Sequence, residues 1–240
     1  MKPTPFNNTY VRLGEDFYAG TSPAPVSNPE LIIFNRALGD ELGLADTHLA
    51  AHDSAAIYAG NVVPEGAEPV AMAYSGHQFG HFNPQLGDGR ALLLGQIESP
   101  DGTQRDIHLK GTGQTRYSRN GDGRAALGPV LREYLVSEAM AKLGVPTTRA
   151  LAAVTTGEEV AREQLLPGGV ITRLATSFVR VGTFEFFASR GDLAAVNRLA
   201  DYVIEHNYPA CHDAPNPYLA LLEAIIDRQA ALIAQWMQLG

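Results

Sequence analysis

The order of apolar and polar positions predicts a hairpin near the middle of the chain. Residues 91–98 form an apolar run, and residues 104–110 alternate apolar with polar side chains. The segment 99–103, Ser-Pro-Asp-Gly-Thr, is a strong turn signal between two such runs. Because side chains alternate across a strand, Lys110 falls on the face opposite Ile107 and Leu109.

Further strands are predicted in the stretch that follows. Residues 147–154 and 159–162 are strand candidates separated by the turn-forming segment 155–158. Residues 170–174 form another after Pro167-Gly168-Gly169. The sequence therefore predicts a sheet built from the middle part of the chain.

Helical periodicity is clearest in residues 125–143, which end at Gly144 with a proline just beyond. Glu138 falls on the stripe of this helix that carries Leu127, Leu131 and Tyr134, whereas Glu133 lies beside a second apolar stripe. Periodicity alone therefore leaves open which carboxylate has an internal partner. Three later segments also have helical patterns, namely 184–190, 193–207 and 218–239.

The N-terminal segment gives a different pattern. Residues 1–30 contain five prolines, which predicts an extended arm lying over the body of the protein. Asn28 and Pro29 match the N-cap and the first position of a helix ending near Gly39 or Gly43. A second, weaker helix is predicted at 46–58.

We expect an α+β protein with three parts. Residues 1–60 provide the arm and its helices, residues 61–182 form a β-rich lobe, and residues 183–240 begin a helical lobe. With 45% hydrophobic and 18% charged residues, the composition is that of an ordinary globular protein. No apolar run approaches the length of a membrane span, and the N-terminus has no export signal. The single Cys211 cannot form an internal disulfide. These features predict a cytoplasmic protein without a membrane partner.

Charge is distributed unevenly along the chain. The formal net charge is −8, yet residues 90–132 contain seven Lys/Arg against four Asp/Glu, a local balance of +3. This basic stretch is rich in glycine, which indicates a small anionic ligand held by backbone amides and guanidinium groups. Nucleic acid is not an expected partner, because its binding needs a basic face on the whole domain.

Two histidines are candidate metal ligands. His77 and His81 are four residues apart, a spacing that suits a metal when it occurs on a helix. The glycines at 76 and 80 argue against a regular helix, and no nearby residue completes a ligand set before Asp88. We therefore expect no metal site in this chain and a structured polar loop at 74–82.

A strand lysine followed by a helix with a carboxylate is also the arrangement of a protein-kinase small lobe, where a Lys–Glu pair orients nucleotide phosphates. The glycine-rich loop, H-R-D and D-F-G motifs of kinases are missing, as are the Walker and Rossmann fingerprints. The residues alone thus predict an α+β domain that binds a nucleotide or phosphate.

Longer blocks of sequence resemble the selenoprotein O family, called YdiU in bacteria. The resemblance covers essentially the whole chain and rests on these blocks: Pro64–Pro69, Tyr74–Phe82, Gln85–Arg90, Leu109–Gly111, Tyr117–Arg119, Gly121–Arg124, Arg132–Leu135, Pro146–Leu151 and Gly182–Glu185. It implies a kinase-like fold and a protein nucleotidyltransferase. Such an enzyme transfers AMP from ATP, bound in a flipped orientation with Mg²⁺ or Mn²⁺, to Ser, Thr or Tyr hydroxyls of protein substrates. For some bacterial members it implies transfer of UMP from UTP.

The resemblance also implies roles for individual residues. The nucleotide-binding set is Gly87, Gly89, Arg90, Lys110, Asp122, Gly123, Arg173 and Arg180. Glu133 is implied as the partner of Lys110, and these two residues form the catalytic pair. Glycines let backbone amides approach phosphate, and the cations offset the charge of a triphosphate.

Family members are about twice as long as this chain. The resemblance implies that the metal ligands and the general base follow Gly240, so we expect these 240 residues alone to have no turnover. Two alternatives remain. One is a catalytically silent, pseudokinase-like module that binds a nucleotide and acts by docking a partner. The other is a conventional kinase, which releases ADP where an adenylyltransferase releases pyrophosphate.

Overall fold

The computed structural model describes residues 6–44, 47, 49 and 54–240. Its main feature is an antiparallel sheet of eight strands, in the order β1-β3-β6-β7-β10-β9-β2, with β8 added beside β10. The strands are β1 (Tyr18–Gly20), β2 (Glu30–Phe34), β3 (Val70–Met72), β6 (Ala91–Glu98), β7 (Gln104–Lys110), β8 (Ala125–Ala126), β9 (Arg149–Ala161) and β10 (Leu165–Ala175). A separate hairpin consists of β4 (Gly76–Gln78) and β5 (His81–Asn83).

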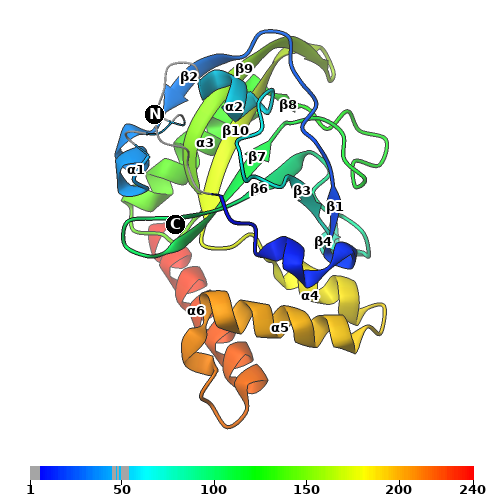
Figure 1. Ribbon diagram of the computed structural model, residues 1–240, viewed down its shortest axis with the longest axis vertical. Coiled ribbons are helices and arrows are strands. Elements are labelled where there is room, and N and C mark those ends of the chain that lie inside the picture. Colours follow the sequence, from blue (N-terminus) through cyan, green and yellow to red (C-terminus); the bar gives the residue numbers. More distant parts are fainter. Residues whose placement is uncertain (1–5, 45–46, 48, 50–53) are drawn as a thin grey trace.

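The α-helices are α1 (Arg36–Glu41), α2 (Ala55–Ala59), α3 (Leu127–Lys142), α4 (Val181–Ala188), α5 (Leu193–Asn207) and α6 (Pro217–Leu239). Figure 1 shows α4, α5 and α6 together at the end of the molecule away from α1 and α2. The expected α+β class is therefore confirmed, as are the hairpin β6–β7, helix α3 and the three C-terminal helices.

Opposite faces of the sheet carry different helices. On one face, Ile107 and Leu109 share a core cluster with Ile57 of α2. On the other face, Ile171 of β10 packs with Val130 of α3. Lys110 is paired with Ile171 in the β7–β10 register, so its side chain projects on the α3 side of the sheet.

The junction between the sheet and the C-terminal helices has a core of its own. Leu93 of β6 and Phe178, which lies between β10 and α4, pack with Phe187 of α4 and Leu199 of α5. This cluster also contains Phe17, from the segment before the sheet. The helices are thereby fixed against the same strands that carry the basic residues.

The first helix predicted near the N-terminus is wrong, and the second is confirmed from residue 55 onward. The helix expected from Asn28 is the strand β2, and α1 begins only after Asn35, whose side chain accepts a hydrogen bond from the amide of Leu38 at 3.2 Å. The run Leu31–Phe34 contains two isoleucines and a phenylalanine, which favour a strand, and its pairing with β9 outweighs the Asn-Pro signal. Of the helix expected at 46–58, the part from 55 onward is α2, and positions 46, 48 and 50–53 lie outside the described residues.

The predicted arm is also more structured than its prolines suggested. It contains two 3₁₀ helices, Tyr10–Leu13 and Glu15–Phe17, before β1. Their apolar side chains are buried, with Tyr10 1% and Phe17 0% exposed, because they fill the junction core. The turn expected at 155–158 is also wrong, because these residues are part of β9, which continues through them next to a register shift against β10.

The His77–His81 segment is a β-hairpin, and the imidazole Nε2 of His77 contacts a carboxylate oxygen of Glu185 at 3.0 Å. This contact ties the hairpin to α4.

None of the helices in the described ranges combines the length and the apolar character that crossing a membrane requires.

Candidate functional site

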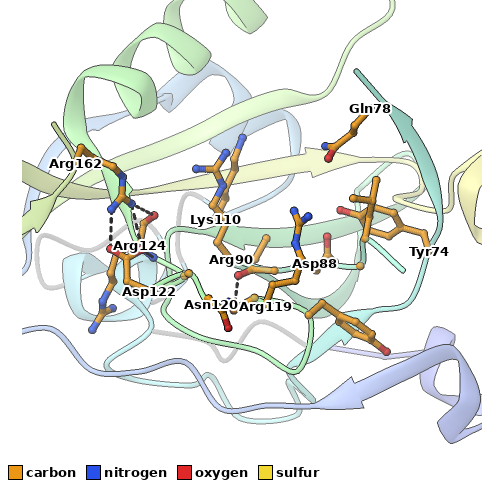
Figure 2. Close-up of a pocket in the computed structure, with 18 of the residues that line it drawn as sticks. Tyr74, Gln78, Asp88, Arg90, Lys110, Arg119, Asn120, Asp122, Arg124 and Arg162 are labelled. Atoms are coloured by element: carbon orange, nitrogen blue, oxygen red, sulfur yellow. Dashed lines mark hydrogen bonds and ion pairs between the residues drawn. The ribbon is translucent and has the colours of Figure 1, made fainter. Parts of the chain in front are cut away.

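A cleft of about 720 Å³ lies along the α3 side of β7 and β10. Residues from the 86–91 turn and the 117–124 loop line it, together with Lys110, Arg173 and Arg180. Figure 2 shows Lys110 and Arg90 near its middle, Asp122 and Arg162 toward one end, and Tyr74 and Gln78 toward the other. The cleft therefore brings together segments far apart in sequence.

The cleft wall is strongly cationic. Its basic residues outnumber its two aspartates, Asp88 and Asp122, and they are Arg90, Lys110, Arg119, Arg124, Arg162, Arg173 and Arg180. This excess of positive charge occurs in a chain whose formal net charge is −8. Such a concentration favours a small anion with several charges.

Two glycines allow the backbone to approach the cleft closely. Gly87 has φ +62° and Gly123 has φ +67°, values at which side chains with a Cβ are strained. A Cβ on Gly87 would overlap the ring of Tyr117, and one on Gly123 would overlap the carbonyl of Gly113. Glycine is thus required at both positions for the two cleft loops to pack.

Lys110, Glu133 and Arg173 form one ionic cluster beside the cleft. The Lys110 Nζ lies 2.5 Å from Oε2 of Glu133, and a terminal nitrogen of Arg173 lies 3.1 Å from Oε1 of the same carboxylate. Burial opposes ionisation of Glu133, but the charges of Arg173 and Lys110 outweigh it and lower its pKa. A single carboxylate therefore orients two cations.

The cluster continues into the interior through His108 and Asp88. The second terminal nitrogen of Arg173 is 2.9 Å from Nδ1 of His108, whose Nε2 is 3.1 Å from Oδ2 of Asp88. His108 is fully buried and Asp88 is 3% exposed. Among the described atoms, Nε of Arg173 is buried and has no hydrogen-bond partner. Arg173 thus retains donor capacity beyond its protein contacts.

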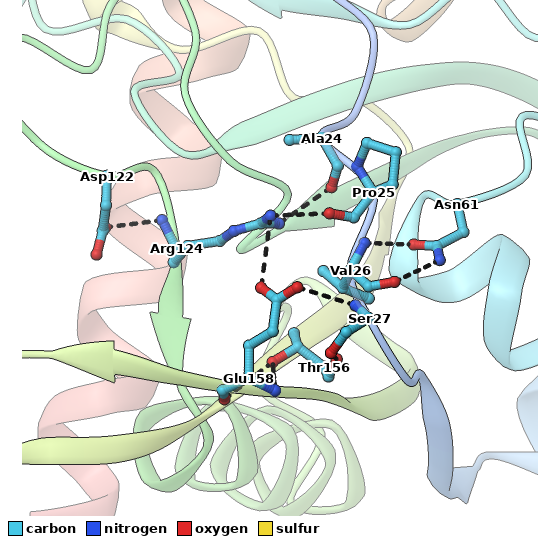
Figure 3. Close-up of polar contacts among 9 residues, drawn as sticks. All are labelled: Ala24, Pro25, Val26, Ser27, Asn61, Asp122, Arg124, Thr156 and Glu158. Carbon is cyan, nitrogen blue, oxygen red and sulfur yellow. Dashed lines mark hydrogen bonds and ion pairs between the residues drawn. The ribbon is translucent and has the colours of Figure 1, made fainter.

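The remaining cations differ in how far they are committed to other partners. The guanidinium of Arg124 donates to the carbonyls of Ala24 and Pro25 at 3.1 and 3.0 Å (Figure 3), and it lies 3.8 Å from Glu158. Arg162 forms a two-point contact with Asp122, at 2.7 and 3.1 Å. Arg124 therefore fixes the N-terminal segment, while Arg162 fixes the 117–124 loop.

Arg180 stands at the opposite end of the cleft, with its guanidinium 4.8 Å from the ring centroid of Tyr74. All eight residues of the expected nucleotide-binding set line this cleft. Glu133 contacts Lys110 and Arg173 from α3. Glu138, the rival carboxylate, instead contacts Arg149 at 2.8 Å.

Sequence patterns alone give no role to several residues in the cleft or directly behind it. His108 was noted only as a polar residue that alternates with apolar ones on its strand, although it shares a face with Lys110. Asp88 belongs to the family block Gln85–Arg90, but no sequence pattern gives it a partner. Arg162 has no motif, and its role depends on a contact with Asp122, 40 residues earlier in the chain, which no local pattern discloses.

Potential metal ligands in the described part of the chain are dispersed. No group of three or more His, Cys, Asp or Glu side chains in it is arranged to hold a metal ion. In the cleft, Asp88 is occupied by His108 and Asp122 by Arg162. The cleft residues therefore fit an anion and do not fit a protein-built metal site.

Comparison with known proteins gives a consistent family. The family described as "Protein adenylyltransferase SelO" matches residues 2–240. A protein of Rhizobium meliloti (strain 1021), named "Protein nucleotidyltransferase YdiU", is 63% identical over 235 residues, covering 98% of this chain and 48% of that protein. Proteins of the same name from Rhizobium johnstonii and Bradyrhizobium sp. (strain ORS 278) are each 61% identical over 236 residues, covering 98% of this chain and 47% and 48% of theirs.

The chain thus spans about half the length of these curated relatives. The family match extends over nearly every residue, including the cleft, β7 and α3. The chain belongs to the protein adenylyltransferase SelO family.

Proposed function

We propose that this chain is the nucleotide-binding half of a protein nucleotidyltransferase that transfers AMP from ATP to hydroxyl groups of target proteins. The observation that carries the proposal is the cluster of Arg90, Lys110, Arg173 and Arg180 on the wall of one cleft. Four cations match the charge of a nucleoside triphosphate. The names of the relatives support transfer of a nucleotide to protein.

Charge also suggests how the nucleotide lies. The triphosphate belongs beside Lys110 and Arg173, which are held by Glu133, and near Arg180. The nucleoside belongs toward Asp122, whose carboxylate is unsuited to phosphate but can accept a hydrogen bond from a ribose hydroxyl or an amino group. Because Arg162 neutralises Asp122, this end of the cleft can take an uncharged group.

In the proposed reaction, the oxygen of a Ser, Thr or Tyr side chain attacks the α-phosphorus of ATP. A new oxygen–phosphorus bond forms, the bond from the α-phosphorus to the bridging oxygen of the β-phosphate breaks, and pyrophosphate leaves. The hydroxyl proton goes to a base that we do not assign to this chain. Arg90, Lys110, Arg173 and Arg180 hold the phosphates and stabilise the leaving charge.

The binding step is tested on this chain by calorimetry with ATP, UTP, AMP and adenosine. We expect the affinity of the chain for the ligand to fall steeply as phosphates are removed. Comparison of UTP with ATP shows whether the cleft distinguishes between the two bases. Equal affinity for ATP and adenosine would overturn the assignment of the cations. The variant Arg162→Gln should weaken ATP binding less than Arg173→Gln does, because Arg162 contacts Asp122 rather than the phosphates.

The transfer step needs a polypeptide that joins these 240 residues to the C-terminal half found in the relatives. Incubation with ATP labelled at the α- or γ-phosphate distinguishes the outcomes. Label on protein from α-labelled ATP only, with release of pyrophosphate, supports adenylyl transfer. Label from γ-labelled ATP with release of ADP supports a kinase, and ATP binding without either label supports the catalytically silent module.

A further inference from the structure

We propose that His108 is a positioning residue for Arg173, acting as a neutral ring that Asp88 orients and that aims the guanidinium at the phosphates. The inference rests on the proposed nucleotide binding at this cleft. It assigns a role to two buried residues, His108, which lies behind the cationic wall, and Asp88, which lines the cleft beside it.

The hydrogen-bond pattern fixes the tautomer of the ring. Arginine can only donate, so Nδ1 of His108 must accept from Arg173 at 2.9 Å. Nε2 therefore carries the proton and donates to Oδ2 of Asp88 at 3.1 Å. The same oxygen of Asp88 accepts from the amide of Met72 at 3.2 Å, which anchors the carboxylate to β3.

The surroundings keep this arrangement dry and uncharged at the ring. Phe178 stacks on His108 with ring centroids 4.4 Å apart, and the Arg173 guanidinium lies 5.2 Å from the same Phe178 centroid. The charged groups that face the ring are Asp88, Arg173 and Arg180. Burial is the largest of the effects that lower the pKa of His108 to about 4. The charges of Arg173 and Arg180 also lower this pKa, whereas Asp88 raises it.

A neutral ring matters because a protonated one would place a second cation against Arg173 and remove the acceptor. With the ring neutral, Arg173 is held at both terminal nitrogens, by His108 on one side and by Glu133 on the other. These two contacts define the plane of the guanidinium. Arg173 and Lys110 are therefore held in position before the nucleotide binds. They are held by one continuous series of contacts, Asp88–His108–Arg173–Glu133–Lys110.

Two substitutions separate the contacts of the ring. His108→Asn places an amide oxygen near the position of Nδ1 and can still accept from Arg173. His108→Gln places an amide nitrogen near the position of Nε2 and can still donate to Asp88, but it offers no acceptor to Arg173. We expect His108→Gln to weaken ATP binding about tenfold and His108→Asn by less than about threefold.

A purely structural role predicts a different result, in which both variants lose thermal stability and bind ATP as the wild type does. A double-mutant cycle adds a second criterion. In the Arg173→Ala background, His108→Gln should change the ATP dissociation constant by less than about twofold, since its effect passes through Arg173. Independent effects of the two substitutions would overturn the proposal.

Nuclear magnetic resonance of ¹⁵N-histidine-labelled wild-type chain tests the geometry without any nucleotide. We expect the His108 signal, assigned from through-bond correlations in the wild-type spectrum, to show protonated Nε2 and unprotonated Nδ1 and to remain unchanged from pH 8 to pH 5. An Nδ1-protonated ring, or titration near pH 6.5, would overturn the proposal even if the variants fail to fold. Failure of the wild type to bind ATP, with this spectrum intact, would instead count against the proposed function.

Discussion

Two carboxylates on α3, five positions apart, have separate partners, and this separation gives a sharp prediction. Glu133 contacts Lys110 and Arg173 at the cleft, whereas Glu138 contacts the start of β9. We predict that Glu138→Gln destabilises the fold without changing ATP affinity. Glu133→Gln is the matched control, and it should weaken ATP binding with the smaller loss of stability.

The magnitude follows from the hydrogen bonds of Glu138. Its two oxygens accept from Nε and a terminal nitrogen of Arg149 at 3.0 and 2.8 Å, from the Ala150 amide at 2.8 Å and from Asn35 at 2.8 Å. A glutamine amide accepts on one side only and places an NH₂ group against the remaining donors. Hydrogen bonds to charged groups contribute about 1.5–3 kcal/mol each, but Arg149 is 28% exposed and regains water. We therefore expect a loss of about 2 kcal/mol, or a fall in melting temperature of about 4–8 °C.

Urea denaturation at pH 7 and in acid measures this loss. Burial opposes ionisation of Glu138, but the hydrogen bonds from Arg149 and the Ala150 amide outweigh it and lower its pKa. Its stabilisation is thus present above the unfolded-state pKa and is lost as pH falls through the folded-state pKa. The stability curves of wild type and Glu138→Gln should converge in acid. Loss of ATP binding in Glu138→Gln, with binding retained in Glu133→Gln, would refute the assignment of the two carboxylates.

Three further predictions follow from the same contacts. Lys110→Ala should weaken ATP binding at least about tenfold, measured by calorimetry. Its melting temperature should stay close to that of the wild type, because the lysine is partly exposed and its stabilising contribution is small. Burial raises the pKa of Asp106 to about 6, so the folded state holds the proton more tightly than the unfolded state does. The contribution of Asp106 to stability therefore falls as pH rises from about 4 to 6. Asp106→Asn should remove this pH dependence of the free energy of unfolding, measured by urea titration. Magnesium-free ATP should raise the melting temperature more than AMP does, and AMP more than adenosine, because bound phosphates relieve repulsion among the cleft cations; equal shifts would contradict this.

Local signals were sufficient for part of the fold. The β6–β7 hairpin follows from Pro100, Asp101 and Gly102 between two strand patterns, and α3 follows from its apolar stripes and its glycine end. Long-range pairing decided the elements that were misassigned. Leu31–Phe34 forms a strand because β9 provides an unpaired edge more than a hundred residues away, which an N-cap pattern at Asn28 cannot reveal.

The candidate site shows the same division between local and distant information. The resemblance of the sequence blocks was enough to name eight residues that line the cleft, but it did not name Arg162, and the polar face of β7 is typical of a solvated strand. That face is buried instead, with Asp106 4% and His108 0% exposed, because the segment after β10 and helix α5 cover it. The β7–β10 register places His108 opposite Arg173, 65 residues further along the chain. Arg173 is therefore held by His108 on β7 and by Glu133 on α3, and its charge is offset by Glu133 and by Asp88 of the 86–91 turn, which is why no single stretch of sequence discloses the site.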